Sequence, residues 1–118
     1  MIEELVAQVF AARNAAHREH WATKSYSQHM ALGAFYDGLP EIIDGIVESY
    51  QGQHGLIELD GQLVTPRVTD CCDFLKKQVK WIQSHRKEIA KGSTDIENQI
   101  DSLLGLYNST LYKLENLK

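Results

Sequence analysis

Apolar residues recur along most of the chain at steps of three and four positions, the repeat of an amphipathic helix. The pattern predicts four helices, over residues 2–22, 26–51, 67–91 and 94–116. Pro40 lies inside the second segment and lacks a backbone N–H donor. We therefore expect a kink or a break in that helix just before the proline.

Signals for helix ends agree with this division of the chain. Gly92 follows the third segment in the position of a C-cap, and Thr94 with Glu97 has the spacing of a capping box. Residues 52–66 contain three glycines and a proline and lose the helical repeat. They are predicted to form a long loop.

The lengths of the connections predict the topology. Both short connections favour antiparallel hairpins, one from the first two helices and one from the last two. A helix of about 24 residues is roughly 36 Å long, and a loop of about 15 residues reaches roughly 50 Å when extended. The predicted fold is therefore all-α, a single domain over residues 1–118: a four-helix bundle with a ferritin-like crossover between the second and third helices. An up-down-up-down bundle is the alternative, disfavoured because "LIELDGQLV" offers apolar residues that would pack during a crossing.

Composition excludes several classes of partner. The net charge of −4 gives no electrostatic reason to expect nucleic acid or an anionic membrane as a partner. No apolar run approaches the roughly 18 residues of a membrane span, and the acidic, helix-like N-terminus does not resemble a targeting peptide. The two cysteines, Cys71 and Cys72, are neighbours and join no distant segments, which favours a reducing cytoplasm.

Histidine and arginine occupy the first helix at positions where a plain bundle would use apolar residues. On a helical wheel, Arg13 and His20 fall near the centre of the apolar stripe and His17 at its edge. Burial of such groups requires partners, so we expect Arg13 and His20 to face the core in paired form. His29 lies at the border of the apolar stripe of the second helix.

The carboxylates of the second helix lie on the side away from its apolar stripe. They are Asp37, Asp44 and Glu48. Asp44 and Glu48 are four positions apart, so both can approach one cation. Because they point away from the bundle core, they form either a solvated acidic face or one half of a site between two subunits.

These residues resemble the Dps group of ferritin-like iron oxidases. The resemblance is carried by "HW" at His20–Trp21, by His29, and by "DGIVE" over residues 44–48. It implies a metal site between subunits, with His29 from one and Asp44 and Glu48 from the other. Either His17 or His20 is the first-helix histidine, and the family's carboxylate one turn after the second-helix histidine is Gly33 here. Small ferritin-like proteins of bacteriophages are also similar.

A rival resemblance uses the same stretch. "RNAAHREH" fits the R-x₄₋₆-H pattern of HEPN-type ribonucleases, which implies that Arg13 binds phosphate and His20 acts as an acid–base catalyst. The second hypothesis, ahead of the ribonuclease, is a non-enzymatic helical oligomer that blocks a partner protein or holds a small anion. Its pocket would be formed by Arg13, the histidines, Trp21 and Tyr26.

The leading hypothesis from the sequence is a homo-oligomer that binds a divalent metal ion between subunits. A mixed set of imidazoles and carboxylates suits iron or zinc better than calcium. The candidate ligands are His17, His20 and His29 from one chain and Asp44 and Glu48 from another, with Asp37, Arg13 and Trp21 as additional candidates.

Overall fold

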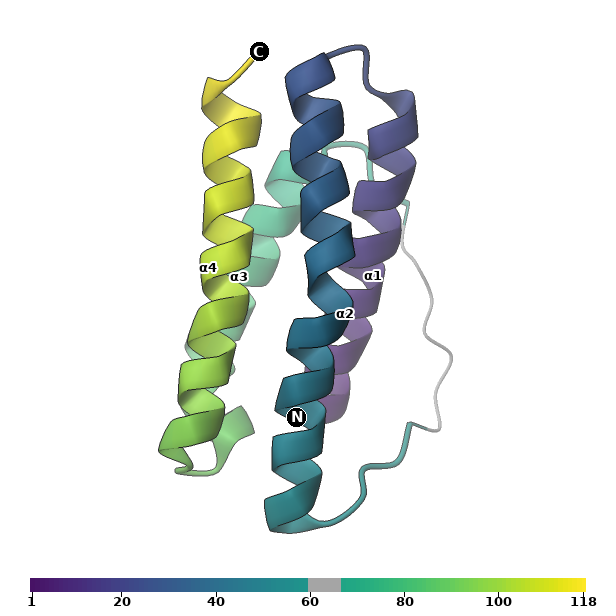
Figure 1. Cartoon of the computed structure of the whole chain (residues 1–118). Helices are drawn as coiled ribbons and strands as arrows, with labels where there is room; N and C mark the ends of the chain where they lie inside the picture. The colour runs from purple at the N-terminus through teal and green to yellow at the C-terminus, as the bar shows by residue number, and fades with distance from the viewer. Residues whose placement is uncertain (60–66) are drawn as a thin grey trace.

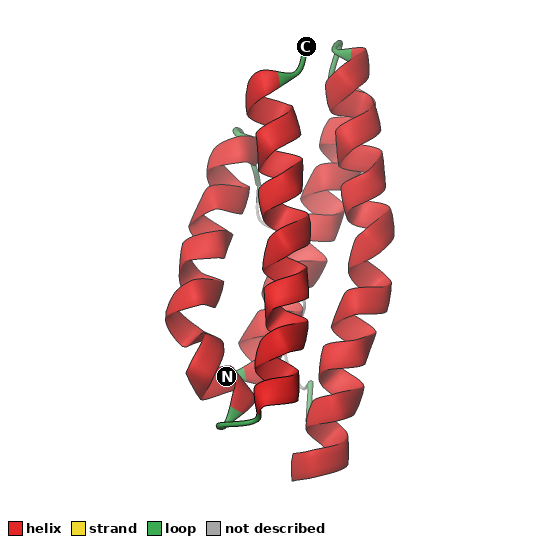
Figure 2. Ribbon diagram, turned by 60° about the vertical axis from the view of Figure 1, so that its left-hand side comes forward, coloured by secondary structure: helices red, strands yellow, loops and turns green. Residues whose placement is uncertain are grey.

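The computed structural model describes residues 1–59 and 67–118 and folds them into four helices (Figure 1). The helices are α1 (Ile2–Ala22), α2 (Tyr26–His54), α3 (Cys71–Ala90) and α4 (Thr94–Asn116). No strand occurs in this part of the chain, and the loops are confined to the ends of the bundle and its side (Figure 2). The prediction of an all-α four-helix bundle is confirmed.

The helices are connected as a bundle with one long crossover. α1 and α4 run in one direction, and α2 and α3 run in the other (Figure 1). α2 packs against α1 and α4, whereas α3 packs against α4 and less extensively against α1. The end of α2 and the start of α3 lie at opposite ends of the bundle, so their connection has to pass along its length, as predicted. Residues 60–66 of the predicted loop lie outside the described residues.

The structure differs from the predicted helices in two places. α2 ends at His54 rather than at residue 51, and it is not broken at Pro40, where the buried Leu39 and Ile43 hold the helix on both sides of the missing hydrogen bond. α3 begins four residues later than expected. The side chain of Asp70 accepts a hydrogen bond from the backbone N–H of Asp73 (3.1 Å) and so caps the helix there.

The predicted capping box of α4 is also displaced by one position. Ser93, rather than Thr94, is the N-cap residue, and its hydroxyl donates to the Asp95 carboxylate instead of capping the helix. The C-cap residue of α3 is Lys91, with a positive φ of 50°, and the predicted C-cap Gly92 follows it with a φ of 80°.

The centre of the core contains one polar link among three helices. Tyr107 of α4 is fully buried and meets Phe35 edge to face, with ring centres 5.1 Å apart. Its hydroxyl donates to Oε1 of Gln78 (2.7 Å), and Nε2 of Gln78 donates to the backbone carbonyl of Gln8 (2.8 Å). The link therefore fixes α1, α3 and α4 relative to one another while leaving no polar atom of Gln78 without a partner.

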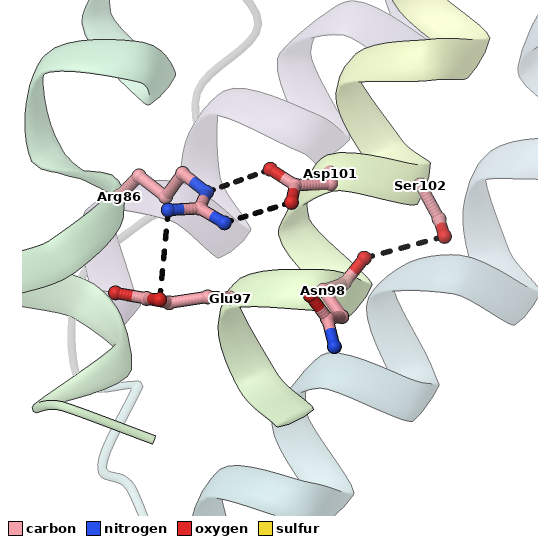
Figure 3. A network of polar contacts seen from close by, with 5 residues as sticks. All are labelled: Arg86, Glu97, Asn98, Asp101 and Ser102. Carbon is pink, nitrogen blue, oxygen red and sulfur yellow. Dashed lines mark hydrogen bonds and ion pairs between the residues drawn. The ribbon is translucent and has the colours of Figure 1, made fainter. Parts of the chain in front are cut away.

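An ion cluster joins α3 and α4 on the surface (Figure 3). Arg86 donates two hydrogen bonds to the Asp101 carboxylate (2.6 and 2.7 Å), and Glu97 lies 3.6 Å from the same guanidinium. Paired donation of this kind favours the ionised carboxylate, and the hydrogen bonds from Arg86 lower the pKa of Asp101.

Asp101→Asn is expected to lower the urea midpoint at neutral pH by a small amount. A carboxyl group whose pKa is lower in the folded state stabilises the protein above its unfolded pKa of about 4, and that contribution is lost as the pH falls further. The midpoints of Asp101→Asn and the parent protein should therefore converge as the pH falls below the lowered pKa of Asp101. A difference that persists unchanged at acid pH would show that the loss comes from packing instead.

Candidate functional site

One outer face of the α1–α2 hairpin carries nearly all the candidate residues from the sequence. His17 of α1 stacks on Tyr36 of α2, and farther along the hairpin Arg13 lines the same cavity as Pro40. Beyond that level, Val6 of α1 lines a groove with Val47 of α2. We call this surface the α1–α2 face.

Histidines and aromatic residues gather at one end of this face, which we call the histidine end. The rings of His20 and His29 are stacked, with centres 3.6 Å apart and planes 17° apart. His17 packs between Tyr36 and Trp21, each ring centre being 4.2 Å away. The histidine end is therefore a continuous set of packed rings from both helices, and all three histidines are half-buried.

Two reciprocal hydrogen bonds hold the stacked histidines. Nδ1 of His20 lies 2.7 Å from the backbone carbonyl of His29, and Nδ1 of His29 lies 2.8 Å from the carbonyl of His20. A carbonyl oxygen only accepts, so both Nδ1 atoms carry the proton. His20 is in the last turn of α1, where carbonyls lack a helical partner, and the His29 ring supplies a donor. The remaining ring nitrogen of each residue, Nε2, is the one suited to bind a ligand.

Gly33 provides the space for this arrangement. A Cβ atom at position 33 would lie 3.2 Å from Cε1 and 3.3 Å from Nδ1 of His20. The sequence had suggested that Gly33 marks a missing carboxylate ligand, but in the fold it lies against the His20 ring. The signal for this contact in the sequence was the small Gly33 one turn after His29, together with a histidine, His20, at the end of the preceding helix.

The expectation that Arg13 and His20 face the core is wrong. Arg13 is exposed, and His20 is half-buried at the edge of the hairpin. The buried stripe of α1, which packs against α2 and α3, is formed mainly by small and branched residues, and its members are Ile2, Leu5, Val6, Val9, Ala11, Ala12, Ala15 and Ala16. Arg13 lies on the flank of this stripe, and its long side chain reaches solvent.

The carboxylates of α2 point outward, as predicted. Asp37, Asp44 and Glu48 are exposed, and Asp44 and Glu48 border an apolar groove of about 430 Å³. The groove is formed by both helices and by the segment after α2; its apolar residues are Val6, Phe10, Ile43, Val47, Ile57 and Leu59. We call this groove and its two carboxylates the acidic end of the α1–α2 face. The sequence interpretation had identified the carboxylates but not the groove.

One chain does not assemble a complete metal site in its described part. No group of three or more histidine, cysteine, aspartate or glutamate side chains is arranged there to hold an ion. The histidines and the Asp44–Glu48 pair lie at different ends of the same face, so one subunit does not bring them together.

The residues proposed for the ribonuclease and for the anion pocket do not come together in one site either. Arg13 and His20 are seven positions apart on α1, about 10 Å along the helix axis. Trp21 and Tyr26 are 71% and 76% exposed, and Arg13 lines a different cavity, of about 160 Å³, with Pro40 and Asp44. A single chain therefore presents these residues on an open surface.

A separate pocket at the start of α3 is lined by both cysteines. It has a volume of about 220 Å³, and Glu19, Asp70, Cys71 and Cys72 are among its lining residues. Both thiols are free, and burial raises the pKa of Cys71 to about 12. The Cys71 thiol is thus protonated at neutral pH and is a poor nucleophile.

Comparison with known sequences assigns the chain to a family. Residues 20–114 match the sequence profile of DUF5856, which is described as a family of unknown function. The chain belongs to this family. It is also 28% identical over 119 residues to the "uncharacterized 14.6 kDa protein in mobD-ri intergenic region" of Enterobacteria phage T4, a match that spans 95% of this chain and 86% of the phage protein.

These similarities indicate a small phage-encoded helical protein, and they assign no activity. No solved structure matches the chain. Within the described residues, none of the four helices of this DUF5856 member is both long and apolar enough to cross a membrane.

Proposed function

We propose that this chain forms a ferritin-like homo-oligomer that binds a divalent transition metal ion between two α1–α2 faces. His17 and His20 of one copy and Asp44 and Glu48 of another are the ligands, as in the Dps-like arrangement. The observation that carries the proposal is the placement of imidazoles and exposed carboxylates at opposite ends of one face.

A two-fold axis brings these two ends together. Arg13 and Pro40 line one cavity and so mark a common level of the hairpin. His20 lies seven positions from that level on α1, while Asp44 and Glu48 lie four and eight positions from it on α2, toward the other end. At 1.5 Å per residue these offsets are about 10 Å on one side and about 6 to 12 Å on the other. Rotation about this level therefore superposes the histidine end of one copy on the acidic end of the other.

The ring geometry favours His17 and His20 as the histidine ligands. Lone pairs of imidazole lie in the ring plane, so the parallel rings of His20 and His29 do not converge on one ion. The ring centres of His17 and His20 are 6.3 Å apart and their planes are at 60°. With metal–nitrogen bonds of about 2 Å, two imidazoles on one ion have ring centres roughly 5 to 6 Å apart, close to this separation. The role of His29 is then to hold His20 through stacking and the hydrogen bond to its Nδ1.

Titration with Co²⁺, followed by visible absorption, tests the metal site. The parent protein is expected to bind one equivalent per site, and His17→Ala or the double variant Asp44→Asn/Glu48→Gln to bind at least about tenfold more weakly. His85→Ala and Glu88→Gln on α3 are the matched controls and should bind as the parent does. Absence of binding at stoichiometric Co²⁺, or equal binding by all variants, would show that the proposal is wrong.

Oxidation of iron is tested with the same variants. Anaerobic addition of Fe²⁺ followed by air should give a ferric absorbance rise that His17→Ala and His29→Ala abolish and that His85→Ala retains. Binding of Co²⁺ without such a rise would support a metal-binding protein that does not oxidise iron.

A further inference from the structure

Trp21 is a large aromatic side chain exposed on the α1–α2 face. Its side chain is 71% exposed at the end of α1, and its indole ring lies 4.2 Å from the His17 ring, tilted by 41°. An exposed tryptophan is a frequent centre of protein interfaces, because it contributes a large apolar area at small entropic cost. The fold itself does not use this area.

An unfilled apolar groove lies on the same face at the acidic end. Its floor is formed by Val6 and Ile43, and half-exposed side chains such as Phe10 and Leu59 form its walls. The volume of about 430 Å³ is sufficient for an indole ring. Asp44 and Glu48 border the groove, so its charge suits an occupant that carries imidazole or cationic groups beside an apolar one.

The histidine end of a second copy has this composition. Trp21 is flanked there by His17 and His20, and the exposed Lys24 follows shortly after. Trp21 lies eight positions from Arg13 on one side, and Val6 lies seven positions from it on the other. At 1.5 Å per residue these offsets are about 12 and 10 Å along α1, so the two-fold rotation that pairs histidines with carboxylates also places Trp21 over the groove.

We infer that two copies of this chain pair through the α1–α2 face, with Trp21 of each copy filling the groove formed by Val6, Phe10, Val47, Ile57 and Leu59 of the other. The inference names the partner of the proposed metal site and rests on the same two-fold arrangement. It does not require a metal ion, because the contact is apolar at its centre and polar at its border. Such a contact is isologous and closes on itself, so it gives a dimer.

Sedimentation in EDTA measures this pairing without metal. The parent protein is expected to be a dimer, and Trp21→Ala and Leu59→Asp are each expected to raise the dissociation constant by at least about a hundredfold. Both positions are exposed in one chain, so neither change should alter helicity or the unfolding midpoint of the monomer. Tyr112→Ala, at an exposed position on α4, is the control and should leave the dimer intact.

Fluorescence locates the indole. In a Trp81→Phe background Trp21 is the sole tryptophan, and its emission should shift to shorter wavelength as the protein concentration rises through the dissociation constant. A dimer that is insensitive to Trp21→Ala, or a Trp21 emission that stays solvent-like in the dimer, would overturn the inference even if Co²⁺ binds. A Trp21-dependent dimer that takes up no Co²⁺ would support the inference and refute the metal site. A strict monomer would refute both.

Discussion

Gln78→Ala is expected to lower the free energy of unfolding by about 2 to 4 kcal/mol. The substitution removes the acceptor of the buried Tyr107 hydroxyl, removes the donor to the Gln8 carbonyl, and leaves a cavity between α1, α3 and α4. The orphaned phenol accounts for much of the cost, since a buried hydroxyl without a partner loses its hydration and gains nothing in return. Urea unfolding followed by helical circular dichroism measures the change.

The hydrogen bond and the packing can be separated by a double variant. Tyr107→Phe alone leaves Oε1 of Gln78 without its donor and should cost about 1 to 2 kcal/mol. Gln78→Leu alone orphans the phenol, but Gln78→Leu with Tyr107→Phe removes both polar partners and keeps the volume. The double variant should therefore be more stable than the sum of the single changes predicts, by about 1 kcal/mol or more. Gln83→Ala, exposed on α3, is the control and should stay within about 0.5 kcal/mol of the parent. Additive single changes would contradict the link.

The sequence was sufficient to predict the architecture, because the apolar repeat and the connection lengths are local properties. The bounds of α1 and α4 agree with the predicted ranges, and the crossover follows from a loop long enough to span the bundle. The start of α3 was missed because Val68 continues the apolar repeat, whereas the helix begins at the cap made by Asp70. A repeat reports which side of a helix is apolar; a cap is decided by one side chain and one backbone N–H.

The candidate site was predicted in part. The outward direction of Asp44 and Glu48 follows from their phase relative to the apolar residues of α2, and the structure agrees. The prediction that Arg13 faces the core was wrong, because a helical wheel places Cα atoms and takes no account of how far a long side chain extends. The pairing of His20 with His29 depends on which levels of α1 and α2 meet, and that level is set by packing over the whole hairpin. No pattern within one helix contains this information.

Gly33 was misinterpreted for the same reason, because its role depends on which level of α1 it meets. Placed on one helix, Gly33 interrupts a series of candidate ligands. Placed against α1, it is the position that lets two imidazoles stack and exchange hydrogen bonds with two backbone carbonyls. The histidines thus have a structural role in joining α1 to α2 whether or not their Nε2 atoms bind a ligand.

Gly33→Val is expected to lower the free energy of unfolding by about 1 to 3 kcal/mol, by overpacking the contact with His20 and breaking the stacked pair. A Cβ atom alone would lie 3.2 Å from the His20 ring, and the two methyl groups of valine require the ring to leave its place. Gly105→Val on α4 is the matched control, since nothing lies within 4 Å of a Cβ at that helical position. There the same substitution should be neutral or slightly stabilising, because glycine is the poorer helix former by about 0.5 kcal/mol.

Two further measurements attribute this loss to the histidine pair. NMR of the imidazole nitrogens should report protonated Nδ1 in both His20 and His29 of the parent, and loss of that state in Gly33→Val. His20→Ala should destabilise the parent but add little to Gly33→Val, because the contacts it removes are already gone. Equal stability of the two valine variants, or full additivity with His20→Ala, would show that Gly33 is not what admits the stacked histidines. A loss confined to Gly33→Val and not additive with His20→Ala would show that the stacked pair fixes α1 on α2. The pair then also sets the geometry in which His17, Trp21 and the groove face a second copy.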